Sequence, residues 1–192
     1  AWFATGRVAA GEWPRTELMG RELAGKRLGL VGYGAIARVT ARMARDLGMS
    51  VAAYDPLLPA EHAAWAHAIR QPLTELLKDS DVVSLHVPLT DATRNMIDAR
   101  AISTMRRGAI LVNAARGGVV DEAALCESLR SGHLGGAALD VFAREPVDAA
   151  AGALFAGVPN LILTPHIAGV TDESNVRVSA VTAEAVARHL GA

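Results

Sequence analysis

A glycine-rich segment near residue 32 has the residue types and spacing to bind a phosphorylated nucleotide. The segment from Gly32 to Ala37 reads GYGAIA and lies between an apolar run and a stretch of helical periodicity. We expect Gly32 to permit a tight turn and Gly34 to let the backbone approach a pyrophosphate, which the first amides of the helix would bind. Ala37 stands where the strict pattern has a third glycine, and it is still small enough for close packing of helix on strand.

An acidic residue, Asp55, ends the next apolar run about twenty residues after the glycines, where such folds bind the adenosine ribose. Its carboxylate would accept hydrogen bonds from the ribose hydroxyls and repel a phosphate there, which favours NAD over NADP. Pro56 follows it, so no arginine stands next to it to bind that phosphate. A plain tight turn and strand end would use the same residues, and methyltransferases that bind adenosylmethionine have a similar loop and acid. The pattern therefore predicts nucleotide binding but leaves the cofactor chemistry open.

The elements that must position these residues follow from the periodicity of the chain. From residue 28 onward, short apolar runs alternate with longer segments of helical period, which is typical of a parallel sheet with helices on both faces. The predicted strands are 28–32, 51–54, 68–70, 82–86, 110–113, 137–141 and 161–164. The predicted helices are 36–47, 73–77, 99–105, 123–129 with Asp121 as N-cap, and 173–190. The pattern predicts an α/β fold of the Rossmann type, a doubly wound parallel sheet in one nucleotide-binding domain.

The composition argues against several classes of partner. The 192 residues carry 19 Lys and Arg against 20 Asp and Glu, so no overall field attracts nucleic acid or an anionic membrane. No apolar run reaches the length of a membrane-spanning helix. Cys126 is the only cysteine, so no internal disulfide can form, and no Cys/His cluster has the spacing of a metal site. We therefore expect no nucleic-acid, membrane or metal partner, and a cytoplasmic location.

Four further segments each follow a predicted strand, at the carboxyl edge of the sheet where α/β folds bind ligands. They read HVPLT at 86–90, NAARGG at 113–118, ALDVF at 138–142 with Glu145-Pro146 after it, and PHIAG at 165–169. In order and spacing, these segments resemble the D-2-hydroxyacid dehydrogenase family over essentially the whole chain. The resemblance implies hydride transfer between NAD and C2 of a small D-2-hydroxy acid or 2-oxo acid.

The resemblance assigns the catalytic roles to Arg116, Glu145 and His166. The planar guanidinium of Arg116 would bind the substrate carboxylate and carbonyl through paired hydrogen bonds, which a lysine would do less well. His166 would give a proton to the substrate oxygen during reduction and take it back during oxidation. Glu145 would accept the other imidazole proton, orient the ring and stabilise its charged form. Taken one at a time, each residue would more plausibly be a surface arginine, a loop histidine or a turn glutamate.

The resemblance also implies a set of contacts with the cofactor, several of them made by the backbone. It places residues 35 and 36 at the pyrophosphate, 87 and 88 on the adenine side, 114–116 under the nicotinamide ribose and Asp140 near the carboxamide. The predicted cofactor-binding residues are Gly32, Gly34, Ala35, Ile36, Asp55, His86, Val87, Pro88, Ala114, Ala115, Arg116, Asp140, His166 and Gly169.

The resemblance further implies that the chain is a fragment, because most of the family's substrate domain would precede it. We expect residues 1–20 to be a segment between domains that contacts a second subunit, making the intact protein a homodimer. Residues 21–170 would be the NAD-binding domain, and 171–192 a helix that returns toward the substrate domain.

The choice of substrate is left open at this point. Segments 13–17 and 165–175 look similar to sulfolactate dehydrogenases, while a phosphoglycerate-type or general hydroxyacid activity remains an alternative. A protein of another class would also suit the sequence, namely a non-catalytic, NAD-responsive corepressor of the same fold. An adenosylmethionine-dependent methyltransferase is the third possibility.

Overall fold

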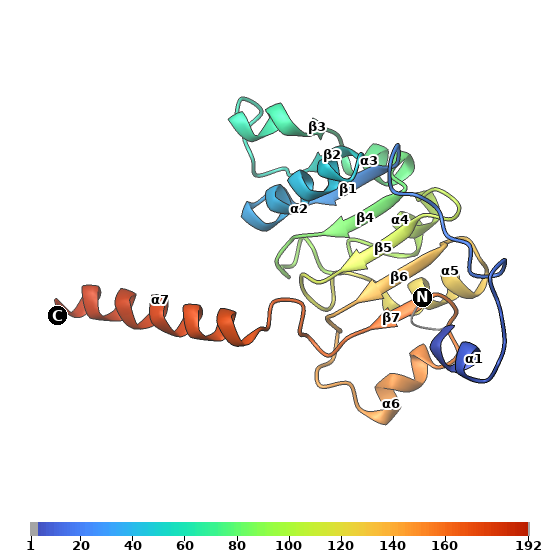
Figure 1. Cartoon of the computed structure of the whole chain (residues 1–192). Helices are drawn as coiled ribbons and strands as arrows, with labels where there is room; N and C mark the ends of the chain where they lie inside the picture. Colours follow the sequence, from blue (N-terminus) through green and yellow to red (C-terminus); the bar gives the residue numbers. More distant parts are fainter. Residues whose placement is uncertain (1–3, 192) are drawn as a thin grey trace.

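Seven parallel strands form one sheet in the computed structural model, which describes residues 4–191 (Figure 1). Their order is β3-β2-β1-β4-β5-β6-β7, so the winding direction reverses between β1 and β4, where such sheets bind ligands. The strands are β1 (Arg27–Val31), β2 (Ser50–Tyr54), β3 (Ile69–Arg70), β4 (Val82–Leu85), β5 (Ile110–Asn113), β6 (Gly136–Leu139) and β7 (Leu161–Leu163). The predicted Rossmann-type fold is confirmed, and so are all seven predicted strands.

The helices are α1 (Thr5–Ala9), α2 (Ala35–Asp46), α3 (Leu73–Asp79), α4 (Ala99–Thr104), α5 (Glu122–Arg130), α6 (Ala149–Gly152) and α7 (Asp172–Leu190), with 3₁₀ turns η2 (Ala63–His67) and η3 (Ala153–Phe155). All five predicted helices are present, with ends that differ by no more than two residues. The predicted cap is also confirmed, since the Asp121 side chain accepts the Ala124 amide at 3.0 Å. The predicted N-terminal segment and C-terminal helix include residues 1–3 and 192, which lie outside the described residues.

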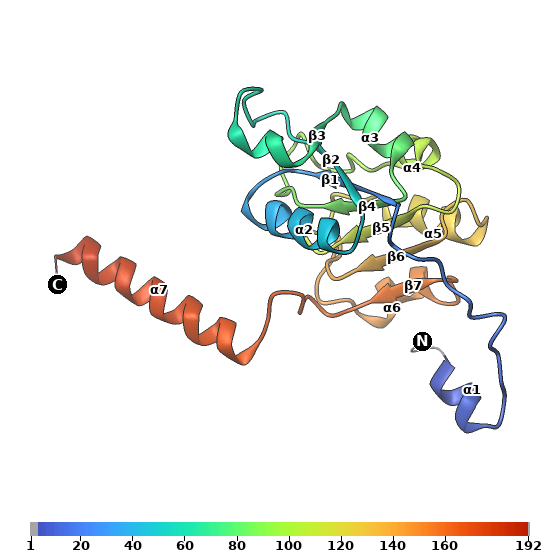
Figure 2. The same ribbon diagram turned by 45° about the horizontal axis from the view of Figure 1, so that its top comes forward.

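Helices lie on both faces of the sheet, but unevenly (Figure 2). On one face, α3, α4 and α5 cover the larger core, which includes Leu76, Leu111 and Leu125. On the other face, α2 packs on β1 and β2 through Ala37, Ala41 and Ala44. Small side chains allow the helix to approach the strands closely.

The apolar residues that predicted α2 are not the ones it buries. Ile36, Met43 and Leu47 are 75%, 60% and 57% exposed, and Val39 is also exposed. Their spacing identified the helix correctly, whereas alanines form the face that packs on the sheet. The helical period therefore did not identify the packed face in this segment.

The last helix, α7, projects away from the sheet in both ribbon views (Figures 1 and 2). None of its 19 residues is buried. Its start is well defined, because Thr171 and Ser174 form a capping box that satisfies two amides. Among residues 4–191, no helix combines the length and apolar composition that crossing a bilayer requires.

Candidate active site

The glycine turn at the end of β1 requires a residue without a side chain. Gly32 has φ +89°, and a Cβ there would lie 2.6 Å from the carbonyl oxygen of His86. The turn is held by the Gly32 amide, which donates to Tyr54 O at 2.7 Å. Gly34 is the N-cap of α2 and offers no side chain to its first amides, which stay available to an anion. The predicted residues Ala35 and Ile36 form the first turn of that helix.

Asp55, at the end of β2, closes this turn from the other side. Its Oδ2 accepts the Tyr33 amide at 2.9 Å, and its Oδ1 accepts the amides of Leu57 and Leu58 at 3.0 and 3.2 Å. A carboxylate offers about four acceptor positions, so one is left for a ribose hydroxyl. Asp55 thus also shapes the glycine loop, a role that the sequence did not suggest.

The segment after β4 lies directly against the glycine turn. His86 is half-buried, and its Nε2 lies 3.1 Å from Ser84 Oγ. Burial lowers the pKa of His86, which favours the neutral ring. Val87 reaches the same place, because its Cγ1 lies 3.0 Å from where a Cβ on Gly32 would be. The predicted residues His86 and Val87 therefore border the predicted nucleotide loop, and Pro88 follows them at an exposed position.

The loop that carries Arg116 is tied to the end of β5 by Asn113. The buried Asn113 side chain donates to Arg116 O at 3.0 Å and accepts the Ala115 amide at 3.1 Å. Arg116 is exposed, and its Nη1 donates to Ala115 O at 2.6 Å. Within residues 4–191 no carboxylate forms an ion pair with it, so the guanidinium is available to an anionic substrate. The predicted residue Ala114 lies exposed in the same loop.

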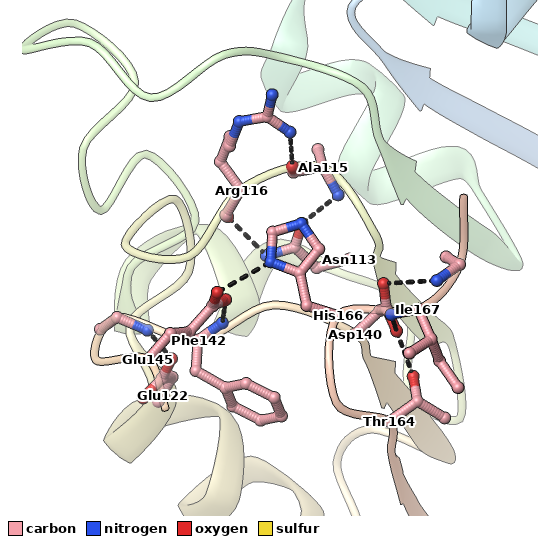
Figure 3. A network of polar contacts seen from close by, with 12 residues as sticks. Asn113, Ala115, Arg116, Glu122, Asp140, Phe142, Glu145, Thr164, His166 and Ile167 are labelled. Atoms are coloured by element: carbon pink, nitrogen blue, oxygen red, sulfur yellow. Dashed lines mark hydrogen bonds and ion pairs between the residues drawn. The ribbon is translucent and has the colours of Figure 1, made fainter. Parts of the chain in front are cut away.

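His166 and Glu145 form a close pair beside this loop (Figure 3). His166 Nδ1 lies 2.7 Å from Glu145 Oε2, while Glu145 Oε1 accepts the Phe142 amide at 2.8 Å. The hydrogen bond to His166, and then the one from Phe142, hold the pKa of Glu145 below its ordinary value. The His166 side chain is 52% exposed. With Nδ1 occupied, Nε2 is the ring nitrogen that can exchange a proton with a substrate.

Asp140, at the end of β6, anchors the loop that carries His166. Its Oδ1 accepts Thr164 Oγ1 at 2.5 Å and the Ile167 amide at 2.9 Å, and its Oδ2 accepts the Ala168 amide at 2.9 Å. Burial would raise the pKa of Asp140, but these hydrogen bonds and the charge of His166 together lower it. His166 itself has φ +56°. This left-handed conformation costs a non-glycine residue about 1–2 kcal/mol, so the anchoring by Asp140 is needed to hold it.

The structure thus brings the predicted residues to the carboxyl edge of the sheet, in two neighbouring groups. The glycine loop, Asp55 and the segment after β4 form one group, and Arg116, Asp140, Glu145 and His166 form the other. Gly169, also predicted, follows the second group, and its carbonyl accepts Ser174 Oγ at 2.9 Å. Sequence reasoning missed the supporting residues Asn113, Thr164 and Glu122. Asn113 and Thr164 had a usable signal, since each is a polar residue at or just after the end of a buried strand.

Comparison with known proteins agrees with this arrangement. Residues 3–168 match the model of the D-isomer specific 2-hydroxyacid dehydrogenase, NAD binding domain. The chain is 56% identical over 192 residues to the (S)-sulfolactate dehydrogenase of Chromohalobacter salexigens, covering 100% of this chain and 62% of that enzyme. It is 40% identical over 188 residues to the hydroxypyruvate reductase of Thermotoga maritima, covering 98% of this chain and 60% of that enzyme.

Among solved structures, the D-lactate dehydrogenase of Aquifex aeolicus complexed with NAD and lactic acid superimposes with a TM-score of 0.86 at 35% identity. That match covers 97% of this chain and 60% of the other. The chain therefore spans about three fifths of the length of these three relatives. The chain belongs to the D-isomer specific 2-hydroxyacid dehydrogenase family and corresponds to the NAD-binding domain of that family.

Proposed function

We propose that the whole protein transfers a hydride between NAD and C2 of a small D-2-hydroxy acid or 2-oxo acid. The observation that carries the proposal is the 2.7 Å contact between His166 and Glu145. It lies at the same sheet edge as the glycine loop and next to Arg116, which has no ion pair among residues 4–191. NAD supplies the hydride acceptor or donor when it is bound. The residues of this chain have to supply substrate binding and proton transfer.

The proposed roles follow from the contacts of each side chain. The Arg116 guanidinium binds the substrate carboxylate through paired hydrogen bonds. During reduction, His166 Nε2 gives its proton to the oxygen on C2 as that oxygen becomes a hydroxyl, and during oxidation it takes the proton back. Glu145 holds the ring through Nδ1 and stabilises the protonated imidazole.

The preference for NAD over NADP rests on Asp55. Its carboxylate lies at the end of β2 and retains an acceptor for a ribose hydroxyl, whereas a ribose phosphate would meet its negative charge. For the substrate, we propose (S)-sulfolactate as the first compound to test, because the relative with 56% identity has that activity in its name. Phosphoglycerate and hydroxypyruvate are the next candidates, since other relatives bear those names.

We also propose how this domain is connected in the whole protein. Residues 21–170 bind the nucleotide, residues 1–20 contact a second subunit of a homodimer, and α7 leads to a substrate domain. The lack of any buried residue in α7 supports a packing partner beyond this domain. The proposal includes a cytoplasmic location, which the single, buried Cys126 supports.

A pair of glycine variants of the full-length protein tests the nucleotide site. Gly34→Ala should lower stability by no more than about 1 kcal/mol, the cost of a poorer N-cap, because its φ is −74° and a Cβ there meets nothing within 4 Å. It should still weaken NADH binding roughly ten- to a hundredfold, because overpacking against a bound pyrophosphate costs about 1–3 kcal/mol. Gly32→Ala should lower both stability and binding, because its Cβ meets His86 O.

Calorimetric titration with NADH, NADPH and adenosylmethionine measures these effects. Tighter binding of adenosylmethionine than of NADH would contradict the proposal, as would a Gly34→Ala variant that binds NADH normally. A screen of 2-oxo acids then tests turnover. Unchanged biological function in Arg116→Ala and His166→Ala variants that still bind NADH would point to a binding protein instead of an enzyme.

A further inference from the structure

Glu122 is a half-buried acid that the proposed reaction does not use, yet its side chain reaches the active-site loops. It is the first residue of α5, and its Oε1 accepts the Ala143 amide at 2.6 Å, across 21 positions of sequence (Figure 3). An acid at the start of a helix commonly interacts with that helix's own amides and dipole. Here Asp121 already caps α5, so the Glu122 side chain is engaged by another segment.

The segment that Glu122 contacts is fixed by two carboxylates at adjacent peptide groups. The Phe142 amide donates to Glu145 Oε1 at 2.8 Å, and the next amide, of Ala143, donates to Glu122. Glu145 in turn holds His166. A displacement of the peptide between Phe142 and Ala143 would therefore move the carboxylate that orients the imidazole.

The same peptide group also touches the loop of Arg116. A Cβ on Gly117 would lie 1.7 Å from Phe142 O and 2.9 Å from the Ala143 nitrogen, so the two loops are in direct backbone contact. Only a glycine next to Arg116 allows this approach. The peptide between Phe142 and Ala143 thus contacts both loops. Its carbonyl oxygen lies against Gly117 in the arginine loop, and the neighbouring Phe142 amide donates to Glu145.

Partial burial and two nearby acids disfavour the charged form of Glu122. Burial raises the pKa of Glu122 against the lowering effect of the Ala143 hydrogen bond, and the negative charges of Asp121 and Glu145 raise it further. An acid placed near two others and partly removed from water would be destabilising without a compensating contact. The short hydrogen bond to Ala143 is that contact.

We propose that Glu122 is a positioning residue of the reaction, which fixes the peptide between Phe142 and Ala143 and thereby the spacing between Arg116 and the Glu145–His166 pair. The inference rests on the proposed function of this site. It predicts that Glu122 affects turnover and proton transfer while leaving the nucleotide loop, which lies in the other group of residues, unaffected.

The test compares Glu122→Ala and Glu122→Gln in the full-length protein, with Glu127→Ala as the matched control. Glu127 is an exposed acid on the same helix. In Glu122→Ala, kcat/KM for the 2-oxo acid should fall about ten- to a hundredfold, because small misplacements of catalytic groups have effects of this order. The dissociation constant for NADH should stay within about twofold of the wild type. Glu122→Gln retains an oxygen that can accept the Ala143 amide, so it should restore most of the activity.

Two further readouts separate positioning from general stability. The pH profile of kcat/KM should shift in Glu122→Ala but not in Glu127→Ala, because only the first loosens the Glu145–His166 contact. In NMR spectra, the hydrogen-bonded Nδ1 proton of His166 should be present in the wild type and Glu122→Gln, and broadened or lost in Glu122→Ala. This signal needs no turnover, so a failure of the proposed function, seen as a wild type inactive on every acid, is distinguishable from a failure of the inference.

The inference is overturned if Glu122→Ala keeps the wild-type kcat/KM, pH profile and Nδ1 signal. It is also overturned if Glu122→Gln is as impaired as Glu122→Ala. If Glu122→Ala does not fold, Glu122→Asp replaces it, because the shorter side chain keeps the charge but cannot reach Ala143 without movement. Loss of turnover with normal NADH affinity in that variant supports the inference, and wild-type turnover overturns it.

Discussion

The two groups of residues at the carboxyl edge are built in opposite ways. In the nucleotide loop the essential feature is the lack of a side chain. At Gly32 a side chain would collide with the neighbouring backbone, and at Gly34 it would fill the space over the start of the helix. In the second group, Arg116, Asp140, Glu145 and His166, which we call the catalytic group after its proposed role, the essential features are charged side chains. Each of its two acids accepts hydrogen bonds from backbone amides. The first group should therefore be sensitive to added atoms, and the second to lost charges and hydrogen bonds.

The largest expected effect is a loss of turnover that leaves nucleotide binding nearly intact. His166→Gln removes the proposed proton donor, and general acid–base catalysis of this kind contributes about 10²–10⁴ in rate. We expect kcat to fall by about that factor while the dissociation constant for NADH changes far less, because His166 is one of many predicted cofactor-binding residues; stopped-flow kinetics and fluorescence titration measure the two. His189→Gln, on the exposed helix α7, is the control. A large loss of NADH affinity in His166→Gln would mean that the two groups are not independent.

A smaller effect concerns the anchoring of the catalytic group. Asp140→Asn leaves one of the loop amides without its acceptor, which should lower the free energy of unfolding by about 1–3 kcal/mol at pH 7. The pKa of Asp140 is lowered in the folded protein from its ordinary 3.8. Its carboxylate therefore contributes stability above about pH 4, and that contribution is lost as the pH falls through the lowered pKa.

Thermal unfolding at several pH values measures this prediction. The difference between the wild type and Asp140→Asn should be greatest at neutral pH and shrink below about pH 4. Asp91→Asn, at an exposed loop position, should show no such dependence. A difference that stays constant down to pH 3 would show that the charge of Asp140 does not stabilise the loop.

The smallest effect is expected in the nucleotide group, where Asp55 is the one charged side chain proposed to contact NAD. Asp55→Asn keeps an oxygen for the Tyr33 amide but loses the charge and one acceptor. NADH affinity should fall about three- to tenfold, in line with a hydrogen bond contributing about 0.5–1.5 kcal/mol. NADPH affinity should fall less or rise, because the repulsion is removed. Equal losses for both nucleotides in fluorescence titrations would assign Asp55 to the loop alone.

The sequence was sufficient for most of the sheet, because buried parallel strands form short apolar runs that end in polar residues. It did not reveal α6, which is too short for a helical period to be recognised. It also misrepresented α2, whose apolar residues are exposed and whose alanines pack on the strands.

For the site, the glycine loop and Asp55 were predicted from their spacing and the proposed catalytic residues from resemblance, whereas the side chains that support them were not predicted. An acid such as Glu122 at the start of a helix has the same local sequence whether it accepts a hydrogen bond from its own helix or from an amide 21 positions away. Likewise, His166 has a left-handed backbone and Asp140, at the end of another strand, accepts the amide of the residue after it; tertiary contacts of this kind leave no local pattern.

The projecting helix α7 is joined to the chain close to the imidazole of His166, so a rotation at its base would be amplified at its far end. Its 19 residues span roughly 28 Å at 1.5 Å per residue, so a rotation of about 10° at its base sweeps the far end through about 5 Å. Ser174 joins that base to Gly169, three residues after His166. Asp140 accepts the Ile167 and Ala168 amides between that base and the ring, so a rotation of α7 need not displace the imidazole.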